Sequence, residues 1–199
     1  LRAAPDGTLS DASGGVVEPS AVAWLTRLLE IGTLCSETTI EQAGGGGPML
    51  DGTATENALV QLALDRGIDA PALRARYPRL SIQHRSDAYR FMLTRHRSPD
   101  GRTLVAIKGS PVEVLGLCTS RLTESEPRPL NAADRAAIKR ANLAMAEGAL
   151  RVLGFAFKEV DKADGPEEEG ARGLTWVGLA GLADPVRPGM RGLMQTLLG

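Results

Sequence analysis

Two periodicities run through the hydrophobic and polar positions of this chain. In some stretches apolar residues recur every three to four positions, which is the spacing of a helix with one buried face. In others they alternate with polar residues, which is the spacing of a half-buried strand. The first pattern predicts helices over residues 21–34, 56–66, 70–77, 111–118 and 132–147. The second predicts strands over residues 80–86, 88–97, 102–108, 150–160 and 174–183.

Capping and turn residues support these bounds. The side chains of Ser, Thr, Asp and Asn can accept a hydrogen bond from a first-turn N–H of a helix. Residues of this kind precede all five predicted helices: Ser20, Thr55, Asp69, Ser110 and Asn131. Gly67 and Gly148 follow two of the helices, where glycine commonly ends a helix. Residues 98–101 read Ser-Pro-Asp-Gly, a turn sequence that predicts a hairpin between strands 88–97 and 102–108.

The order of these elements predicts an α+β fold. Hairpins predominate and no strand–helix–strand unit repeats, so we expect a mostly antiparallel, twisted β-sheet flanked by helices. One domain is expected over residues 20–183, after a flexible lead-in or edge strand at 1–19 and before a connecting segment at 184–199. Loops are predicted at residues 44–48, 119–130 and 161–173.

Composition excludes some classes of function. The chain has 199 residues, of which 43% are hydrophobic, and its formal net charge is -1. This charge gives no overall basis for binding nucleic acid or an anionic membrane. No stretch approaches the roughly 18–20 apolar residues of a membrane span. Cys35 and Cys118 show no CxxC spacing, so we expect reduced thiols in a cytosolic environment. Because the chain does not begin with Met, we expect a piece of a longer protein, and we expect this piece to be monomeric.

The most suggestive chemistry lies at residues 107–111, Ile-Lys-Gly-Ser-Pro. A strand is expected to deliver Lys108 to its end, Gly109 to permit a tight turn, and Ser110 and Pro111 to start a helix. A cation beside a helix N-terminus attracts phosphate or carboxylate. The alternative is an ordinary surface lysine at a turn.

Four motifs, in order, give the chain a family resemblance. Residues 52–59 (GTATENAL) resemble "G-x-x-T-E-x-A-L", and residues 108–113 (KGSPVE) resemble "K-G-A-P-E". Residues 148–153 (GALRVL) resemble a "G-x-R-x-L/V" strand with one extra residue, and residues 181–188 (GLADPVRP) resemble a "D-P-P-R" hinge. In this set the chain resembles the nucleotide-binding domain of P-type cation-transporting ATPases, and not the heavy-metal branch, whose "H-P" dipeptide it lacks.

The resemblance implies an ATP site. Lys108 and Gly109 belong to its phosphate-binding motif, and Arg151 and Leu153 to the strand that supplies a second cation. Glu56, next to Thr55, can accept a hydrogen bond from the adenine amine or orient a lysine. The alternative for Glu56 is a first-turn carboxylate that stabilises its own helix. ATP, as Mg-ATP in the intact pump, is the implied ligand.

The stretch that resembles the adenine-binding "F-x-S-x-x-K-x-M" departs from the family pattern. His84 stands where the family has phenylalanine, Ser86 matches the serine, and Tyr89 stands where the lysine is expected. Imidazole can stack on a base but offers less apolar area than phenyl. Alternatively, Tyr89 or Phe91 stacks on the adenine. We therefore expect weak nucleotide binding.

The resemblance further implies a place in a larger machine. The family's phosphorylated "D-K-T-G-T" motif does not occur in this chain. The expected role is to position ATP for phosphorylation of an aspartate on a separate domain, within an ATP-driven cation translocase, at the cytoplasmic face of a membrane. The phosphorylation and actuator domains of the same full-length protein are the expected partners. Residues 184–199 are expected to contain the hinge, at 184–188, and the incomplete start of the phosphorylation domain. The alternative is a degenerate domain that serves as a regulatory or interaction module.

Overall fold

The computed structural model describes residues 2–3, 9–10, 23–42, 47–124, 126–161 and 171–183. Its elements in chain order are β1 (Arg2–Ala3), β2 (Leu9–Ser10), α1 (Ala23–Leu34), β3 (Thr39–Gln42), β4 (Pro48–Asp51), α2 (Ala54–Asp65), α3 (Ala70–Arg76), β5 (Arg79–Gln83), β6 (Phe91–Arg97), β7 (Thr103–Gly109), α4 (Pro111–Leu117), β8 (Cys118–Leu122), β9 (Pro127–Pro129), α5 (Ala132–Glu147), β10 (Arg151–Val160) and β11 (Leu174–Leu182).

The main sheet of the described residues has seven strands in the order β5-β6-β7-β10-β11-β8-β9. Strands β11 and β8 pair in parallel, and the other neighbours pair antiparallel. Two small hairpins, β1–β2 and β3–β4, lie outside this sheet. The expected α+β class with a mostly antiparallel sheet is confirmed.

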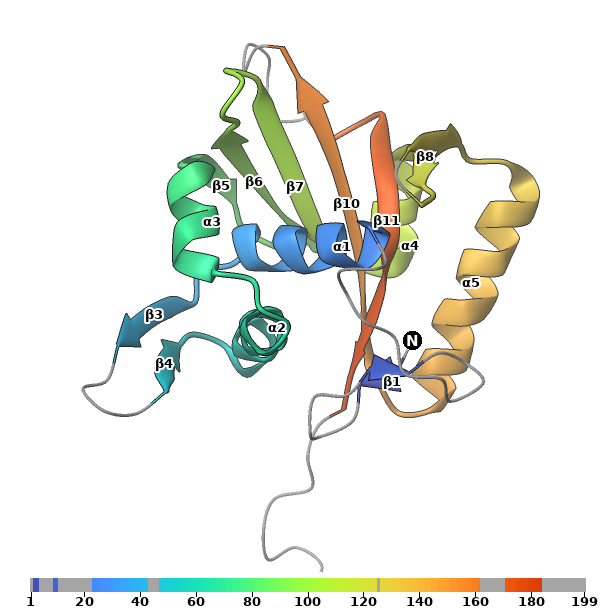
Figure 1. Cartoon of the computed structure of the whole chain (residues 1–199). Helices are drawn as coiled ribbons and strands as arrows, with labels where there is room; N and C mark the ends of the chain where they lie inside the picture. Colours follow the sequence, from blue (N-terminus) through green and yellow to red (C-terminus); the bar gives the residue numbers. More distant parts are fainter. Residues whose placement is uncertain are drawn as a thin grey trace, which may run out of the picture.

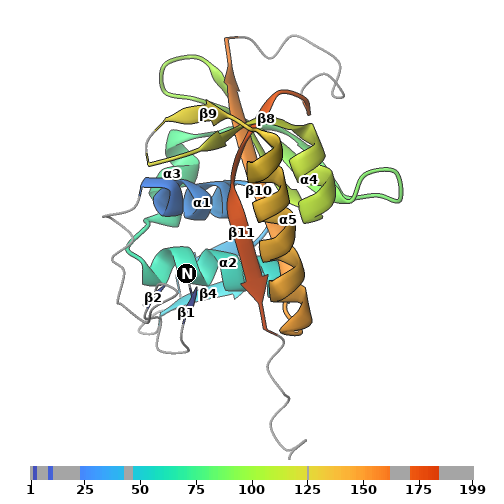
Figure 2. The same cartoon turned by 90° about the vertical axis from the view of Figure 1, so that its right-hand side faces the viewer.

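Helices cover both faces of the sheet (Figures 1 and 2). Helix α1 crosses one face, with α2 and α3 beside it, and we call this side the α1 face. Helices α4 and α5 cover the opposite side, the α4 face. Because successive strand residues point to opposite faces, the central strands β6, β7, β10 and β11 contribute alternate side chains to two separate cores.

The two cores are almost entirely aliphatic and aromatic. The core under α1 consists of Leu28, Ile31, Leu34, Cys35, Leu59, Met92, Leu104, Ala106, Phe155, Phe157 and Val177. The core under α4 consists of Phe91, Leu93, Val105, Ile107, Val114, Leu115, Cys118, Ala156, Ala171, Leu174 and Trp176. Strand β7 shows the alternation, with its even-numbered residues on the α1 face and its odd-numbered residues on the α4 face.

Several local predictions are confirmed. In the turn at residues 98–101, the amide of Gly101 donates to the Ser98 carbonyl at 2.9 Å, and Gly101 adopts φ +85°. Asp69 caps α3 by accepting from the amide of Ala72 at 2.9 Å. Asn131 caps α5, and its capping box is completed by Asp134.

Other local predictions are wrong. Helix α2 is capped by Thr53, which accepts from the amide of Glu56, so Thr55 lies inside the first turn. The segment 119–130 is not a plain loop, because β8 extends to Leu122 and β9 forms within it. Pro48 belongs to β4 rather than to the predicted glycine-rich loop. These strands are short, and β9 carries two prolines, so neither gave a periodic signal.

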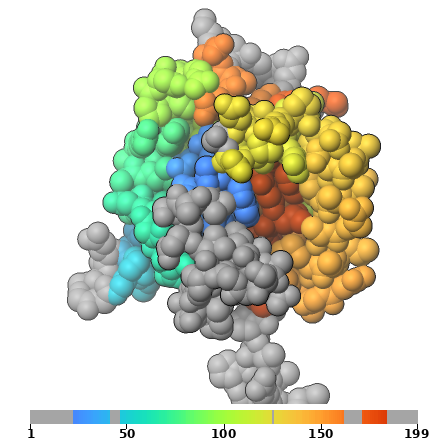
Figure 3. Space-filling model, turned by 45° about the vertical axis from the view of Figure 1, so that its right-hand side comes forward, coloured from blue at the N-terminus to red at the C-terminus, as the bar shows by residue number. Residues whose placement is uncertain are grey.

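Strand β11 reaches the surface between α1 and α5 in Figure 3. Helix α5 packs beside it; most of its residues are exposed and none is fully buried. No helix among the described residues is both long enough and apolar enough to cross a bilayer.

Candidate functional site

A buried ion pair lies at the end of β7. The Lys108 side chain is on the α1 face, between Met92 of β6 and Phe155 of β10 in the sheet register. Its Nζ donates to Oε1 of Glu56 at 2.7 Å, and the two residues are only 6% and 9% exposed. Taking two charges out of water costs several kcal/mol per ion, and a close hydrogen-bonded contact offsets much of that cost. The pair joins the sheet to α2.

The position of Glu56 follows from the start of α2. Its amide donates to the Thr53 side chain at 3.3 Å, which fixes the first turn. A carboxylate in this turn is favoured by the helix dipole. Of the two roles predicted for Glu56 in the site, orienting a lysine is therefore the one visible in the structure.

An exposed cation lies next to this pair. Arg151 begins β10, and its Nη1 donates to Oγ1 of Thr55 at 3.3 Å. Leu153, two residues on, is half-buried against the core on the α1 face, and Phe155 follows beside Lys108. Strand β10 and the first turn of α2 thus bring four of the predicted residues together.

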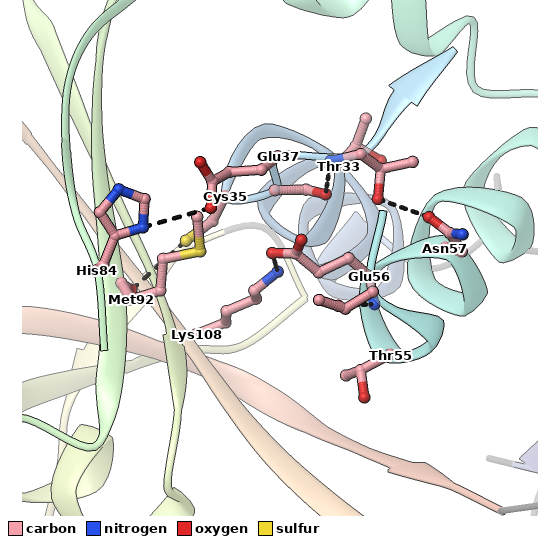
Figure 4. A network of polar contacts seen from close by, with 12 residues as sticks. Thr33, Cys35, Glu37, Thr55, Glu56, Asn57, His84, Met92 and Lys108 are labelled. Atoms are coloured by element: carbon pink, nitrogen blue, oxygen red, sulfur yellow. Dashed lines mark hydrogen bonds and ion pairs between the residues drawn. The ribbon is translucent and has the colours of Figure 1, made fainter. Parts of the chain in front are cut away.

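His84 lies at the rim of the same face, in the segment between β5 and β6. Its Nδ1 is 3.3 Å from Oε2 of Glu37, and both side chains are more than half exposed. Figure 4 shows the His84–Glu37 contact and the Lys108–Glu56 pair in one network, with Met92 and Cys35 between them. Glu37 was not predicted from the sequence, since its partner is far away in the chain.

Three predicted residues are not in this network. The side chain of Phe91 is buried in the core on the α4 face, so the sheet separates it from Lys108. Tyr89 packs on the same core, with its ring centroid 5.6 Å from that of Phe91. Ser86 closes the turn before β6, where its side chain accepts from the Tyr89 amide at 3.3 Å. The alternative in which Phe91 or Tyr89 stacks on a base beside Lys108 does not fit this arrangement.

The expected joint site of Lys108 and a helix N-terminus is also wrong. Lys108 projects to the α1 face, whereas α4 covers the other face. Ser110 makes no side-chain capping bond. Glu113 in the first turn of α4 instead accepts from the backbone amide of Arg90 at 2.8 Å. Gly109 does not turn the chain but is the last residue of β7.

Cys35 forms part of the wall beside Lys108. It is fully buried, and its Sγ donates to the Met92 carbonyl at 3.4 Å. Burial raises the pKa of the Cys35 thiol above its ordinary value, and the Lys108 ammonium partly opposes this shift. The thiol therefore packs as a small apolar group.

A separate hollow of about 810 Å³ lies at the start of α1, between β10 and the β8–β9 hairpin. None of its lining residues belongs to the predicted site. Four of its charged side chains pair with one another: Arg27 bonds Glu30 and Glu159, and Arg102 contacts Glu159 at 2.6 Å. Within the described ranges, no group of three or more His, Cys, Asp or Glu side chains could hold a metal ion. The candidate site is therefore the Lys108 network.

Comparison with known proteins points to one family. The family model described as "P-type ATPase, cytoplasmic domain N" matches residues 24–189. The cation-transporting ATPase pma1 of Synechocystis is 36% identical over 167 residues, which are 82% of this chain and 18% of that protein. A calcium-transporting ATPase of Bacillus subtilis is 30% identical over 84% of this chain and 19% of its own length. The human calcium-transporting ATPase type 2C member 1 is 28% identical over 87% of this chain.

The chain spans about a fifth of the length of these relatives. The family match, by contrast, covers most of the chain and includes nearly every described element from α1 to β11. The α+β architecture and the matched residues lead to one assignment: the chain belongs to the family of cytoplasmic N domains of P-type ATPases.

Proposed function

We propose that the chain binds ATP on the α1 face of the sheet, beside the Lys108–Glu56 pair. The observation that carries the proposal is that a buried ion pair and an exposed cation lie side by side. A buried, mutually neutralised pair lies next to an exposed arginine, Arg151, that already bonds a hydroxyl of the same helix turn. A buried polar pair beside an exposed cation suits a ligand with a polar aromatic end and an anionic end.

The buried pair suits the base. An ammonium has three N–H donors and a carboxylate has several acceptor positions, so one mutual bond leaves both groups with further capacity. The 6-amino group of adenine can donate to Glu56, and a ring nitrogen can accept from Lys108. This differs from the sequence-based expectation that Lys108 serves the phosphates, because its charge is neutralised and nearly enclosed.

Arg151 suits the phosphates. Its guanidinium is exposed at the end of β10 and can give two parallel hydrogen bonds to one phosphate group. Leu153, on the same side of β10, gives an apolar surface between the base and phosphate positions. In this orientation the triphosphate extends toward solvent, where another domain can reach it.

In a longer protein, we infer that this domain presents the γ-phosphate of ATP to an aspartate on a phosphorylation domain, as part of a cation-transporting ATPase. Phosphoryl transfer depends mainly on positioning and on neutralising charge. The relatives named as cation and calcium pumps support this role. The expected hinge at residues 184–188 lies outside the described residues.

Calorimetric and NMR titrations with ATP, ADP and AMP test the proposal. We expect the wild-type chain to bind ATP, with backbone shifts around Lys108. Arg151→Ala should weaken ATP binding roughly 10- to 150-fold, since a hydrogen bond to a charged group contributes roughly 1.5–3 kcal/mol. The loss of affinity caused by Arg151→Ala should be largest for ATP and smallest for AMP. Arg128→Ala, which removes an exposed arginine at the far edge of the sheet, is the matched control.

Lys108 needs a paired design. Lys108→Ala alone leaves the Glu56 carboxylate buried without its cation, and this destabilises the fold. The double variant Lys108→Met/Glu56→Gln removes both charges together, and circular dichroism can verify that it folds. We expect it to lose affinity for adenosine as well as for ATP. Absence of any perturbation near Lys108 at millimolar ATP in the wild-type chain would refute the proposal and favour an interaction module.

A further inference from the structure

We propose that Asn57 is a positioning residue of the nucleotide site, because it holds the first turn of α2 in the place where Glu56 meets Lys108. The inference rests on the proposed function. It adds a residue to the motif at 52–59, in which position 57 can be any amino acid. Asn57 acts on the ligand only through its neighbours in this turn.

The Asn57 side chain connects α2 to the β3–β4 hairpin. Its Oδ1 accepts from the hydroxyl of Thr38 at 2.9 Å. Its Nδ2 donates to the carbonyl oxygens of Leu50 and Gly52, each at 3.3 Å. Thr38 precedes β3, Leu50 lies in β4, and Gly52 follows β4. One amide side chain therefore ties the start of α2 to both ends of the hairpin.

Thr38 is fixed to the body of the domain, so its hydrogen bond anchors Asn57. It is 1% exposed, its carbonyl accepts from Arg74 of α3 at 2.6 Å, and its amide donates to Oγ of Ser36 at 3.2 Å. The packing around the bond is tight. A Cβ at Gly52 would lie 2.7 Å from Oγ1 of Thr38 and 2.8 Å from Oδ1 of Asn57. The glycine therefore leaves room for the bonded pair.

The two residues before Asn57 make the contacts of the candidate site. Glu56 accepts from Lys108 at 2.7 Å, and Thr55 accepts from Arg151 at 3.3 Å. Figure 4 shows Glu56 between Lys108 and Asn57. A rotation of this turn would move both contacts relative to the sheet that carries the two cations. Because binding groups must be held within about 0.5 Å of their productive geometry, the anchor at Asn57 sets the geometry of the site.

The test removes the Thr38–Asn57 hydrogen bond from either side. Thr38→Val replaces the hydroxyl with a methyl group, whereas Thr38→Ser keeps the hydroxyl that donates to Asn57. We expect Thr38→Val and Asn57→Ala each to weaken adenosine binding, measured by NMR titration, by roughly 2- to 12-fold, the factor that corresponds to one net hydrogen bond. ATP should show the same pattern, and Thr38→Ser should bind like the wild type.

Two further readouts separate positioning from a general loss of structure. The double variant Thr38→Val/Asn57→Ala should bind no more weakly than Asn57→Ala, because both changes act through one bond. In the ligand-free chain, Asn57→Ala should shift the NMR signals of Glu56 Cδ and Lys108 Cε. Asn131→Ala removes the cap of α5 on the α4 face, so it should lower stability and keep the wild-type affinity.

Binding is measured well below the unfolding midpoint of each variant, which circular dichroism gives. If Asn57→Ala does not fold, the comparison of Thr38→Val with Thr38→Ser decides. Equal weakening by Thr38→Ser and Thr38→Val, or by Asn131→Ala and Asn57→Ala, would overturn the inference. If the wild type binds but the folded variants match it, Asn57 has no positioning role while ATP binding stands. If the wild type binds neither adenosine nor ATP, the proposed function and this inference fail together.

Discussion

At the residue scale, the neighbouring residues Lys108 and Gly109 have different structural roles. Lys108 supplies a polar group to the α1 face, whereas Gly109 is required by the packing of strands. A Cβ at residue 109 would lie 2.4 Å from Cα of Phe91 and 2.5 Å from the Arg90 carbonyl oxygen. Both are backbone atoms of the neighbouring strand and its approach, so they cannot rotate away. The glycine is explained without a ligand.

We therefore predict that Gly109→Ala destabilises the domain, by about 1–3 kcal/mol as for other overpacked positions. Urea unfolding followed by circular dichroism measures the change. Gly116→Ala in α4 is the control, because a Cβ there meets nothing within 4 Å. It should be neutral or stabilising by up to about 1 kcal/mol, since alanine favours a helix. Equal stability of Gly109→Ala and the wild type would contradict the packing argument.

At the scale of elements, two arginines fasten the carboxyl end of α1 to α3 and β5. Arg74 donates through Nε and Nη2 to the Thr33 carbonyl at 3.3 and 3.2 Å, and through Nη1 to Thr38. Arg79 donates to the Ser36 carbonyl. These carbonyls lie at or just beyond the helix end, where no intrahelical partner exists and where the helix dipole favours a cation. Burial lowers the pKa of Arg74, which stays charged at neutral pH.

Arg74→Ala should cost about 1–3 kcal/mol of stability, because it leaves buried carbonyls without a donor. Chemical denaturation gives this value, and hydrogen exchange should show faster opening at residues 33–38. Arg76→Ala removes an exposed arginine of the same helix, whose guanidinium only approaches the Tyr77 ring at 5.7 Å. If Arg74→Ala lowers the stability as little as Arg76→Ala does, the hydrogen bonds of Arg74 contribute nothing to stability.

At the scale of the whole molecule, His96 ties stability to pH. It is 2% exposed, with Nδ1 2.9 Å from the Tyr77 carbonyl oxygen and Nε2 2.9 Å from the Thr94 hydroxyl. Nδ1 must donate to the carbonyl, and a neutral ring can then accept from Thr94 through Nε2. Burial lowers the pKa of His96 below its ordinary 6.5, and Arg79 and Arg74 act in the same direction.

The sign of the effect follows from linkage. Below pH 6.5 the His96 ring is protonated in the unfolded chain but less so in the folded chain. The unfolded state therefore binds more protons, and the free energy of unfolding decreases as the pH is lowered. The contribution is complete above pH 6.5. We predict a decline in the free energy of unfolding between pH 6.5 and 5 that His96→Asn reduces. His84→Asn, at an exposed position, should retain the decline, and an unaltered pH profile in His96→Asn would contradict the assignment.

Much of the fold could be predicted from local sequence signals. The features that were missed depend on pairing between segments that are distant in the sequence. Asp69 and Asn131 were recognised because a cap and its helix are adjacent in sequence. The β8–β9 hairpin was missed because three residues with two prolines carry no period, and the parallel pairing of β8 with β11 joins distant segments. In the site, Lys108 and Glu56 could be named from motifs. That Phe91 faces the other core, and that Glu37 meets His84, depends on register and packing that no single stretch encodes.

The order of strands also constrains how the chain can fold. Strands β5, β6 and β7 are consecutive, and the β6–β7 pairing begins with Arg97 opposite Thr103, so only a short loop must close. The β7–β10 pairing instead brings Gly109 opposite Gly154, across α4, β8, β9 and α5. Closing this longer loop loses more chain entropy before stabilising contacts form. We therefore expect the β7–β10 pairing, in the middle of the sheet, to form after the meander of β5, β6 and β7.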